Sequence, residues 1–125
     1  MSIPSKTESP FGIKHKVVLV PFPFEDFSTK KVRPALCLSG AFGNYDHVIL
    51  AFISSKTGSQ PEETEMEIDP EQAIWVQSGL IVKSVLKLHK LVSFPKNMIL
   101  RELGSFPPSK SQELEQKLKL IFGIK

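Results

Sequence analysis

The residue best suited to binding an anion is Arg33, one of two arginines in the chain. It lies where a polar loop containing Lys30 and Lys31 leads into an apolar segment. A guanidinium binds a phosphate through two parallel hydrogen bonds, but its pKa, above roughly 12, makes it a poor general base. Its chemistry is therefore stabilisation of a developing negative charge, with proton donation as a second option. An ordinary surface salt bridge is the alternative.

Two further side chains could support such a centre. Ser54 ends an apolar segment, and its hydroxyl is better suited to donating a hydrogen bond to a phosphate than to nucleophilic attack; capping of the next loop is the alternative, and Ser55 is the nearest substitute. His89 can exchange a proton near neutral pH, and strand alternation places Lys87 on the same face. A purely structural hydrogen bond is the alternative for His89.

Metal and thiol chemistry are not indicated. The three histidines lack zinc spacing and the carboxylates form no obvious metal set, so we expect no metal and no other cofactor. The single cysteine, Cys37, lies in the apolar run Ala35–Leu38. That setting favours a buried core thiol over a nucleophile, and one cysteine leaves no disulfide within the chain.

Composition and length bound the class of protein. A chain of 125 residues with 41% apolar content has material for one compact core. Residues 1–12 are expected to be a flexible arm and residues 13–125 the folded domain. The arm lacks the apolar run of a signal peptide, and the longest apolar stretch, Val17–Phe24, is far short of the roughly 20 residues that span a membrane. We therefore expect a cytoplasmic protein without a membrane segment.

The net charge of +3 conceals an asymmetry along the chain. Residues 57–82 contain six acidic residues and no Lys or Arg, which leaves 16 basic and 7 acidic residues elsewhere. A body with a charge of +9 could attract a polyanion such as RNA, while the acidic stretch would be repelled. Merely solvated surface is the alternative for both regions.

Hydrophobic periodicity predicts a mainly β domain. Apolar and alternating runs bounded by Gly, Pro and polar clusters indicate five short strands, the first three forming an antiparallel meander with a turn over 40–46. They are His15–Phe24, Val32–Ser39, His47–Ser54, Glu63–Asp69 and Val85–Val92. Five short strands with turns between them favour a small barrel. Residues 71–83 are ambiguous; Trp75 is expected to cover a sheet edge, with base stacking as an alternative.

The end of the chain changes to helical periodicity. Leu114, Leu118, Ile121 and Phe122 lie on one helix face, where core or dimer packing is expected. Ser109 followed by Gln112 suggests a capping box at the start of this helix.

Several spaced motifs resemble the MazF/PemK family of toxin endoribonucleases. They are Val17–Phe24 with the loop leading to Arg33–Ser39, then Ala51–Ser55, Ser84–Lys90 and Ile99–Gly104. The resemblance spans about residues 15–122. It implies an SH3-like β-barrel with a C-terminal α-helix, a homodimer, single-stranded RNA as substrate and inhibition by a cognate antitoxin.

The resemblance also implies roles for individual residues. Arg33 stands at the catalytic arginine, and Ser54 at a threonine that contacts the scissile phosphate. His89 stands where some members carry an aspartate implicated in acid–base work, and Lys87 at an arginine. Lys30, Lys31, Ser55, Lys56 and Lys87 are then the expected RNA-binding residues. His15 and Lys16 depart from the usual Gly-Asp; His15 is expected at an exposed strand start, with RNA contact as the alternative.

RNA can be cleaved without a metal when its own 2′-OH attacks the adjacent phosphorus. That reaction needs a base, an acid and cationic groups for the phosphate, which two or three side chains can supply. A catalytically decayed barrel that binds nucleic acid or an antitoxin remains an alternative, because Lys87, His89 and the missing Gly-Asp depart from the family. A protein-binding poison of an enzyme such as a topoisomerase is a second alternative.

Overall fold

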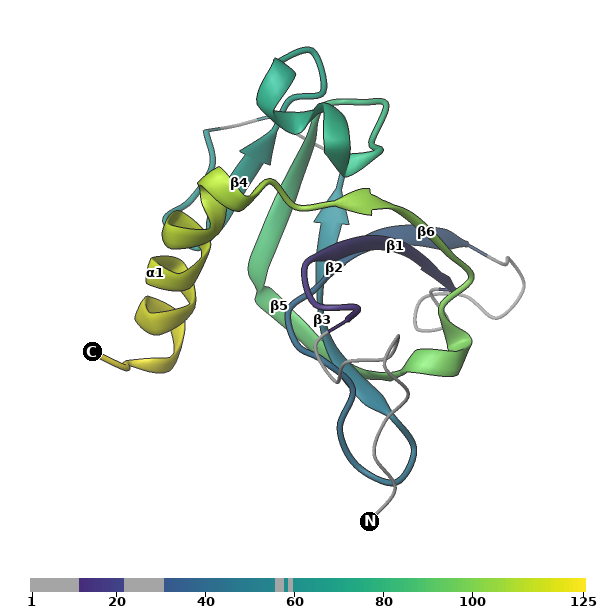
Figure 1. The fold of residues 1–125 in the computed structure, drawn as a ribbon. Coiled ribbons are helices and arrows are strands. Elements are labelled where there is room, and N and C mark those ends of the chain that lie inside the picture. Colours follow the sequence, from purple (N-terminus) through teal and green to yellow (C-terminus); the bar gives the residue numbers. More distant parts are fainter. Residues whose placement is uncertain (1–11, 22–30, 56–57, 59) are drawn as a thin grey trace.

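An antiparallel sheet that curls on itself forms the body of the protein (Figure 1). The structure is a computed structural model that describes residues 12–21, 31–55, 58 and 60–125. In these residues six strands pair in the order β4-β5-β3-β2-β1-β6. They are β1 (Lys16–Pro21), β2 (Val32–Cys37), β3 (His47–Ser54), β4 (Glu65–Ile68), β5 (Ser84–Pro95) and β6 (Arg101–Ser105). The helices are α1 (Ser111–Phe122) and the 3₁₀ turns η1 (Ala73–Ser78), η2 (Lys96–Met98) and η3 (Pro108–Lys110).

Strands β1, β2 and β3 form the predicted meander. The third strand has the expected bounds, and the turn before it closes where Phe42 and His47 exchange two backbone hydrogen bonds of 2.9 and 2.8 Å. Gly43 and Asp46 both have positive φ in this turn, a conformation that glycine and aspartate tolerate well. The turn chemistry of the sequence was therefore a reliable guide to this part of the fold.

The start of β1 differs from expectation. His15 precedes the strand, with a φ of 71°, a region that glycine enters without steric cost. Its N–H donates to the Cys37 carbonyl and its own carbonyl accepts from Phe106 N–H, both at 2.7 Å. The expectation of an exposed strand start is wrong, because these bonds hold His15 partly buried with its ring 6.0 Å from that of Phe106. Burial, with the nearby Lys14 charge, lowers the pKa of His15.

A change of register in β5 curls the sheet. Ala51 of β3 pairs with Leu91, but the next residue, Phe52, pairs with Lys87. Leu88, His89 and Lys90 therefore have no partner on β3, and a strand with such a bulge bends and twists strongly. The first part of β5 pairs with β4 and the end of β3, and the last part with the start of β3. The curled sheet and the C-terminal helix confirm the mainly β, SH3-like barrel.

The chain end after β5 was predicted less well. Arg101–Ser105 forms a sixth strand, β6, which pairs with β1 and was not among the five expected. The capping box is also wrong: Lys110 occupies the N-cap position without a side-chain bond, because the η3 turn leads directly into α1. Gly123, with a φ of 66°, ends the helix. No helix among the described residues has the length and apolarity to cross a membrane.

Two apolar clusters lie on opposite faces of the curled sheet. One lies inside the curl and contains Cys37, which is fully buried as predicted; burial raises the pKa of its thiol to about 12. The other lies under η1 and α1, where Trp75 is 3% exposed and meets Phe106 edge to face at 5.5 Å. Trp75 is thus a core residue that cannot stack on a base.

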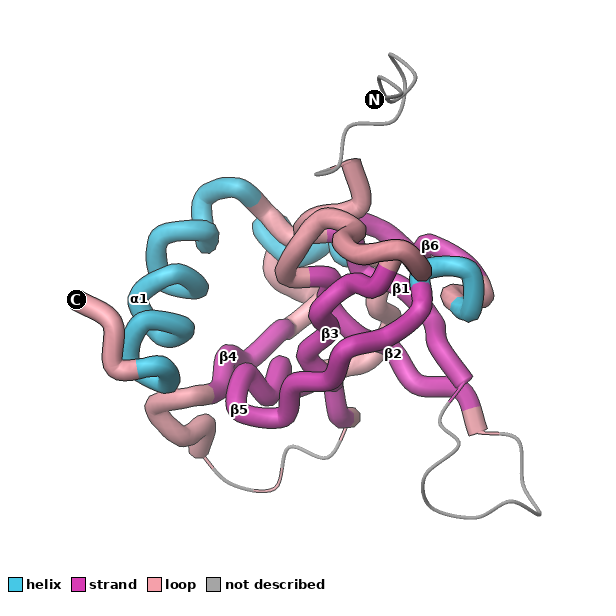
Figure 2. The backbone as a smooth tube through the Cα atoms, turned by 90° about the horizontal axis from the view of Figure 1, so that it is seen from below, coloured by secondary structure: helices cyan, strands magenta, loops and turns pink. Residues whose placement is uncertain are grey.

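Helix α1 lies at the β4 and β5 side of the sheet (Figure 2). Leu114 is fully buried, and Leu118 and Ile121 pack against the same cluster. Phe122, expected on that face, is 59% exposed. The last helical turn therefore leaves apolar surface in contact with solvent.

Two glycines let η1 lie directly against β6. A Cβ at Gly104 would overlap the carbonyl oxygen of Gln77 and the backbone of Ser78. A Cβ at Gly79, whose φ is 76°, would overlap the Leu103 carbonyl. Neither obstacle is a flexible side chain, so the contact requires glycine on both sides.

We expect Gly104→Ala to lower the free energy of unfolding by on the order of 2 kcal/mol, because the added methyl forces two backbones apart. Urea denaturation measures this. Gly58→Ala is the matched control, since a Cβ there meets nothing within 4 Å. Equal stability of the two variants would contradict the proposed close contact.

Candidate functional site

Arg33 and Ser54 lie at the same end of two neighbouring strands. Ala35 of β2 pairs with Phe52 of β3, where the paired register ends, and Arg33 and Ser54 each lie two residues beyond that pair. Directly opposed residues of an antiparallel pair project from the same face. Both side chains are partly buried. The structure therefore places Arg33 and Ser54, which the sequence put at the ends of separate strands, at the same end of the β2–β3 pair.

Lys87 continues this row onto β5. Val85 pairs with Ser54, and Lys87 follows two positions later on the same face, opposite Phe52. Along an extended chain that step is roughly 7 Å. We call the face that carries Arg33, Ser54, Lys87 and His89 the polar row.

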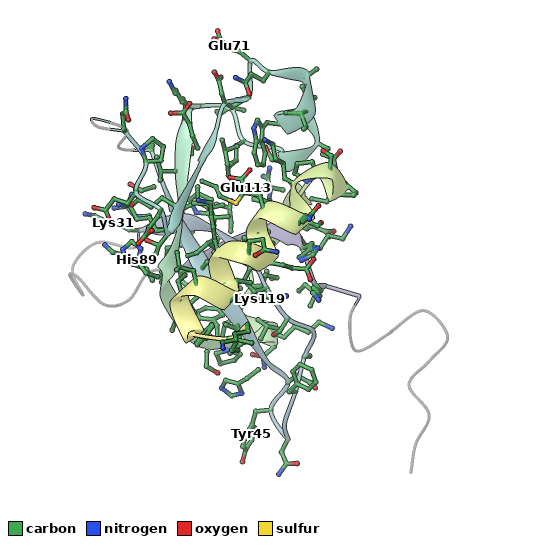
Figure 3. All side chains as sticks on the ribbon, turned by 90° about the vertical axis from the view of Figure 1, so that its left-hand side faces the viewer. Lys31, Tyr45, Glu71, His89, Glu113 and Lys119 are labelled. Atoms are coloured by element: carbon green, nitrogen blue, oxygen red, sulfur yellow. The ribbon has the colours of Figure 1, made fainter. Side chains whose placement is uncertain are left out.

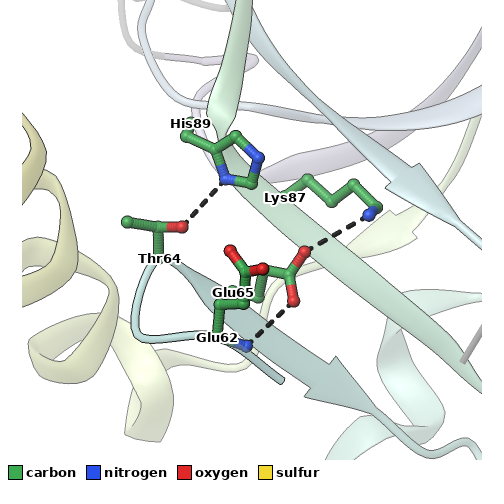
Figure 4. A network of polar contacts seen from close by, with 5 residues as sticks. All are labelled: Glu62, Thr64, Glu65, Lys87 and His89. Atoms are coloured by element: carbon green, nitrogen blue, oxygen red, sulfur yellow. Dashed lines mark hydrogen bonds and ion pairs between the residues drawn. The ribbon is translucent and has the colours of Figure 1, made fainter. Parts of the chain in front are cut away.

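Lys87 is engaged by a carboxylate that the sequence reading did not single out. Its Nζ lies 3.2 Å from Glu65 Oε2, across the pairing of β4 with β5 (Figure 4). Glu65 Oε1 accepts the Glu62 N–H at 2.9 Å, while the Glu65 N–H donates to the Glu62 carbonyl at 2.9 Å. The side chains of Glu65 and Lys87 are only 10% and 26% exposed. The Glu65 carboxylate therefore holds the Lys87 ammonium in place and largely compensates its charge.

Hydrogen bonding favours the ionised form of Glu65. The Glu62 N–H lowers the pKa of this carboxyl, Lys87 lowers it further, and burial opposes both. Glu65 is consequently ionised at neutral pH and into the acid range. The ion pair between Glu65 and Lys87 therefore persists over that pH range.

His89 lies at the far end of the polar row, in the bulged segment of β5. Its Nδ1 is 2.8 Å from Thr64 Oγ1, and its side chain is exposed. Four positions of β5 separate it from Val85, opposite Ser54, which corresponds to roughly 13 Å of extended chain. His89 shares the face of Arg33 and Ser54 without touching them, and an RNA segment would have to lie between them.

The other predicted contacts are placed in part. Lys31 and Ser55 are exposed. Lys31 lies two residues before Arg33, and Ser55 directly follows Ser54. Lys31 and His89 project from the same side of the molecule (Figure 3). Lys30 and Lys56 lie outside the described residues, as does the expected arm apart from Gly12. An open depression of about 490 Å³ is lined by Asp69, Pro70, Glu71, Ile81, Val82 and Lys83, none of them a predicted site residue.

No group of three or more His, Cys, Asp or Glu in the described part of the chain could hold a metal ion. The residues missed by sequence reasoning are Thr64 and Glu65, the polar partners of His89 and Lys87. The alternation Glu65-Met66-Glu67-Ile68 signalled a strand. Pairing Glu65 with Lys87 also required the register between segments far apart in the sequence.

We expect Glu65→Gln to lower the free energy of unfolding at pH 7 by about 1 kcal/mol, because the charged hydrogen bond and ion pair are lost. A carboxyl with a depressed folded-state pKa stabilises above its unfolded pKa, near 4.3, and loses that contribution as pH falls through the lower folded value. The difference from wild type should therefore vanish in strong acid. Denaturation at several pH values measures it.

Glu67→Gln is the matched control for that experiment. Glu67 is on the same strand, and its ion pair with Lys83 is longer, at 3.6 Å, and more exposed, at 39% and 50%. Such a pair contributes little, so this variant should stay close to wild type at every pH. Equal effects of the two substitutions would show that Glu65 is an ordinary surface carboxylate.

Comparisons with known proteins agree on one fold. A family model described as PemK-like, MazF-like toxin of type II toxin-antitoxin system matches residues 14–122. The Mycobacterium tuberculosis toxin MazF-mt6 superposes with a TM-score of 0.65 at 19% identity, covering 88% of this chain and 98% of that one. A MazE-MazF complex from Deinococcus radiodurans gives 0.65 at 17% identity, covering 90% and 96%.

A third structure is an endoribonuclease in complex with its cognate antitoxin from a mycobacterial species. It gives a TM-score of 0.64 at 14% identity, covering 90% of this chain and 96% of that one. No curated protein matches the chain. At these identities the structural matches establish the shared fold, and the family model carries the sequence relationship.

Proposed function

Because the chain belongs to the PemK-like, MazF-like toxins of type II toxin–antitoxin systems, we propose that it is an endoribonuclease that cleaves single-stranded RNA without a metal ion. The observation that carries this proposal is that Arg33 and Ser54 lie at the same end of the paired strands β2 and β3, each two residues beyond the Ala35–Phe52 pair. A guanidinium beside a hydroxyl offers several hydrogen-bond donors to a phosphate. Similar folds include proteins described as endoribonucleases, which supports the assignment.

The proposed reaction uses the RNA as its own nucleophile. The 2′-oxygen bonds to the adjacent phosphorus and the bond to the 5′-oxygen breaks, leaving a 2′,3′-cyclic phosphate and a 5′-hydroxyl. Arg33 stabilises the charge that develops on the phosphate oxygens, and Ser54 donates a further hydrogen bond. His89 takes the proton of the 2′-hydroxyl, the leaving 5′-oxygen takes a proton from water, and His89 then returns its proton to the resulting hydroxide. Lys31 and Ser55, with Lys30 and Lys56 outside the described residues, bind the flanking RNA, and Lys87 lies beside it with its charge held by Glu65.

Purified protein should cleave long single-stranded RNA in EDTA and leave those two ends, because no step requires a metal. DNA of the same sequence should stay intact, since it lacks the 2′-hydroxyl. Arg33→Ala should slow single-turnover cleavage on the order of 10²–10³-fold, and Arg33→Lys should recover only part of the rate. Gel analysis of end-labelled RNA measures both. Full activity of folded Arg33→Ala would remove Arg33 from the reaction.

Added salt should weaken RNA binding, and the exposed Lys31 should contribute more to this salt dependence than Lys87 does. Each phosphate contact on a single strand contributes roughly 0.7 to the slope of log K against log salt. Lys31→Gln should reduce the slope by about that amount, whereas Lys87→Gln should change it little, because Glu65 already compensates its charge. Fluorescence anisotropy with a 2′-O-methyl oligonucleotide measures the slopes. Equal reductions would mean that Lys87 leaves Glu65 when RNA binds.

We further propose a cytoplasmic homodimer that a cognate antitoxin neutralises. An RNA-cleaving toxin has to share a compartment with its substrate and its inhibitor. Exposed apolar residues support self-association: Met98 and Leu100 follow β5, and Leu120 and Phe122 end α1, each 45–59% exposed.

Light scattering at micromolar concentration should give about twice the chain mass of 14.0 kDa. Dimers form where such apolar surface exceeds what one small domain buries. A mass of one chain across that concentration range would contradict the dimer.

A non-catalytic RNA-binding barrel is the second candidate. The ion pair of Lys87 with Glu65 favours it, because this lysine stands at an arginine of the resembled family and its charge is largely compensated. RNA binding without cleavage in the EDTA experiment would select this candidate.

A further inference from the structure

The two ring nitrogens of His89 have different surroundings. Nδ1 is hydrogen-bonded to Thr64 Oγ1 at 2.8 Å. Nε2, on the other side of the ring, makes no hydrogen bond to the described residues. Because His89 is exposed, Nε2 is the nitrogen accessible to an incoming ligand.

Thr64 is itself held against β5. Its carbonyl accepts the Leu88 N–H at 3.0 Å, which continues the β4–β5 pairing by one residue. The next residue, Glu65, is tied to Lys87 and to the Glu62 backbone. The Thr64 hydroxyl therefore has a fixed place beside the bulge of β5, whereas the bulge leaves His89 without a partner on β3.

We propose that Thr64 is a positioning residue that accepts a hydrogen bond from Nδ1–H of His89, so that the neutral ring offers the lone pair of Nε2 to the RNA. This inference rests on the proposed function, and it names the atom that takes the 2′-hydroxyl proton. The hydrogen bond that one ring nitrogen makes determines which tautomer the other presents. Thr64 and His89 therefore act as an orienter and a base.

A hydroxyl partner suits a ring that changes its charge. In the neutral Nδ1–H form and in the imidazolium, Nδ1–H donates to Thr64 Oγ1 in the same way. Nε2 can thus gain and lose a proton with no rotation of the ring and no change of partner. With the opposite tautomer the hydroxyl would have to donate to Nδ1 and would then have to turn away when the ring became charged.

Charged groups near Thr64 and the ring come from β4, β5 and helix α1. They include Glu65 on β4, Lys87 on β5, and Lys117 of α1, whose Nζ donates to the Glu63 carbonyl next to Thr64 at 2.8 Å. The held Glu65–Lys87 pair lies between His89 and Ser54 along the polar row. Thr64→Val removes the side-chain hydroxyl and leaves all of these charges in place, so this variant tests the hydrogen bond alone.

The first test is independent of cleavage. In ¹⁵N-histidine-labelled protein above the pH at which the ring titrates, long-range ¹H–¹⁵N spectra should show His89 as the Nδ1–H tautomer. Thr64→Val should move it to the Nε2–H form or a mixture, while Thr64→Ser should retain the wild-type signature. An Nε2–H tautomer in wild type, or an unchanged tautomer in Thr64→Val, would overturn the proposal.

The second test links the hydrogen bond to the reaction. Single-turnover cleavage by Thr64→Val should be about tenfold slower, because the loss corresponds to one hydrogen bond of about 1.4 kcal/mol. Thr64→Ser should behave as wild type. In a His89→Gln background Thr64→Val should have no further effect, provided circular dichroism shows folded variants.

The two tests separate this inference from the proposed function. An equal loss of rate with and without His89 would show that Thr64 acts only on the fold, which overturns the positioning role. If wild type cleaves no RNA, the proposed function fails, and the spectra still decide whether Thr64 fixes the tautomer.

Discussion

The change of register between Ala51 and Phe52 is the constraint on which the structure depends. It allows one long strand, β5, to pair with β4 on one side and with both parts of β3 on the other. The resulting bend separates a core inside the curl from a core beneath η1 and α1. The same bend releases His89 from the ladder and keeps Lys87 within it, so the geometry of the polar row follows from a backbone irregularity.

The acidic stretch acquires a structural role in this arrangement. Two of its members, Glu65 and Glu67, lie on β4 and pair with Lys87 and Lys83 at the β5 side. These two ion pairs therefore neutralise part of the acidic stretch with lysines that lie outside it in the sequence.

Local signals were sufficient for much of the fold. The turn residues before His47 and the apolar run after it gave the bounds of β3, and helical spacing gave α1. Strand β6 was missed because Arg101–Ser105 lacks apolar alternation and contains Gly104, whose small size serves packing against η1. Arg33 and Ser54 could be proposed from their places at strand ends. Glu65 and Thr64 could not, because their partners lie more than twenty residues away and are fixed only by register.

The reactivity of the buried cysteine can report how often the curled sheet opens. Cys37 is the single thiol of the chain, it is fully buried inside the curl, and its pKa of about 12 leaves almost no thiolate at neutral pH. A thiol reagent can therefore react only when β2 separates from its neighbours. The rate of modification measures how often the curl opens, and protection by a bound antitoxin or RNA would report how far each ligand holds the barrel closed.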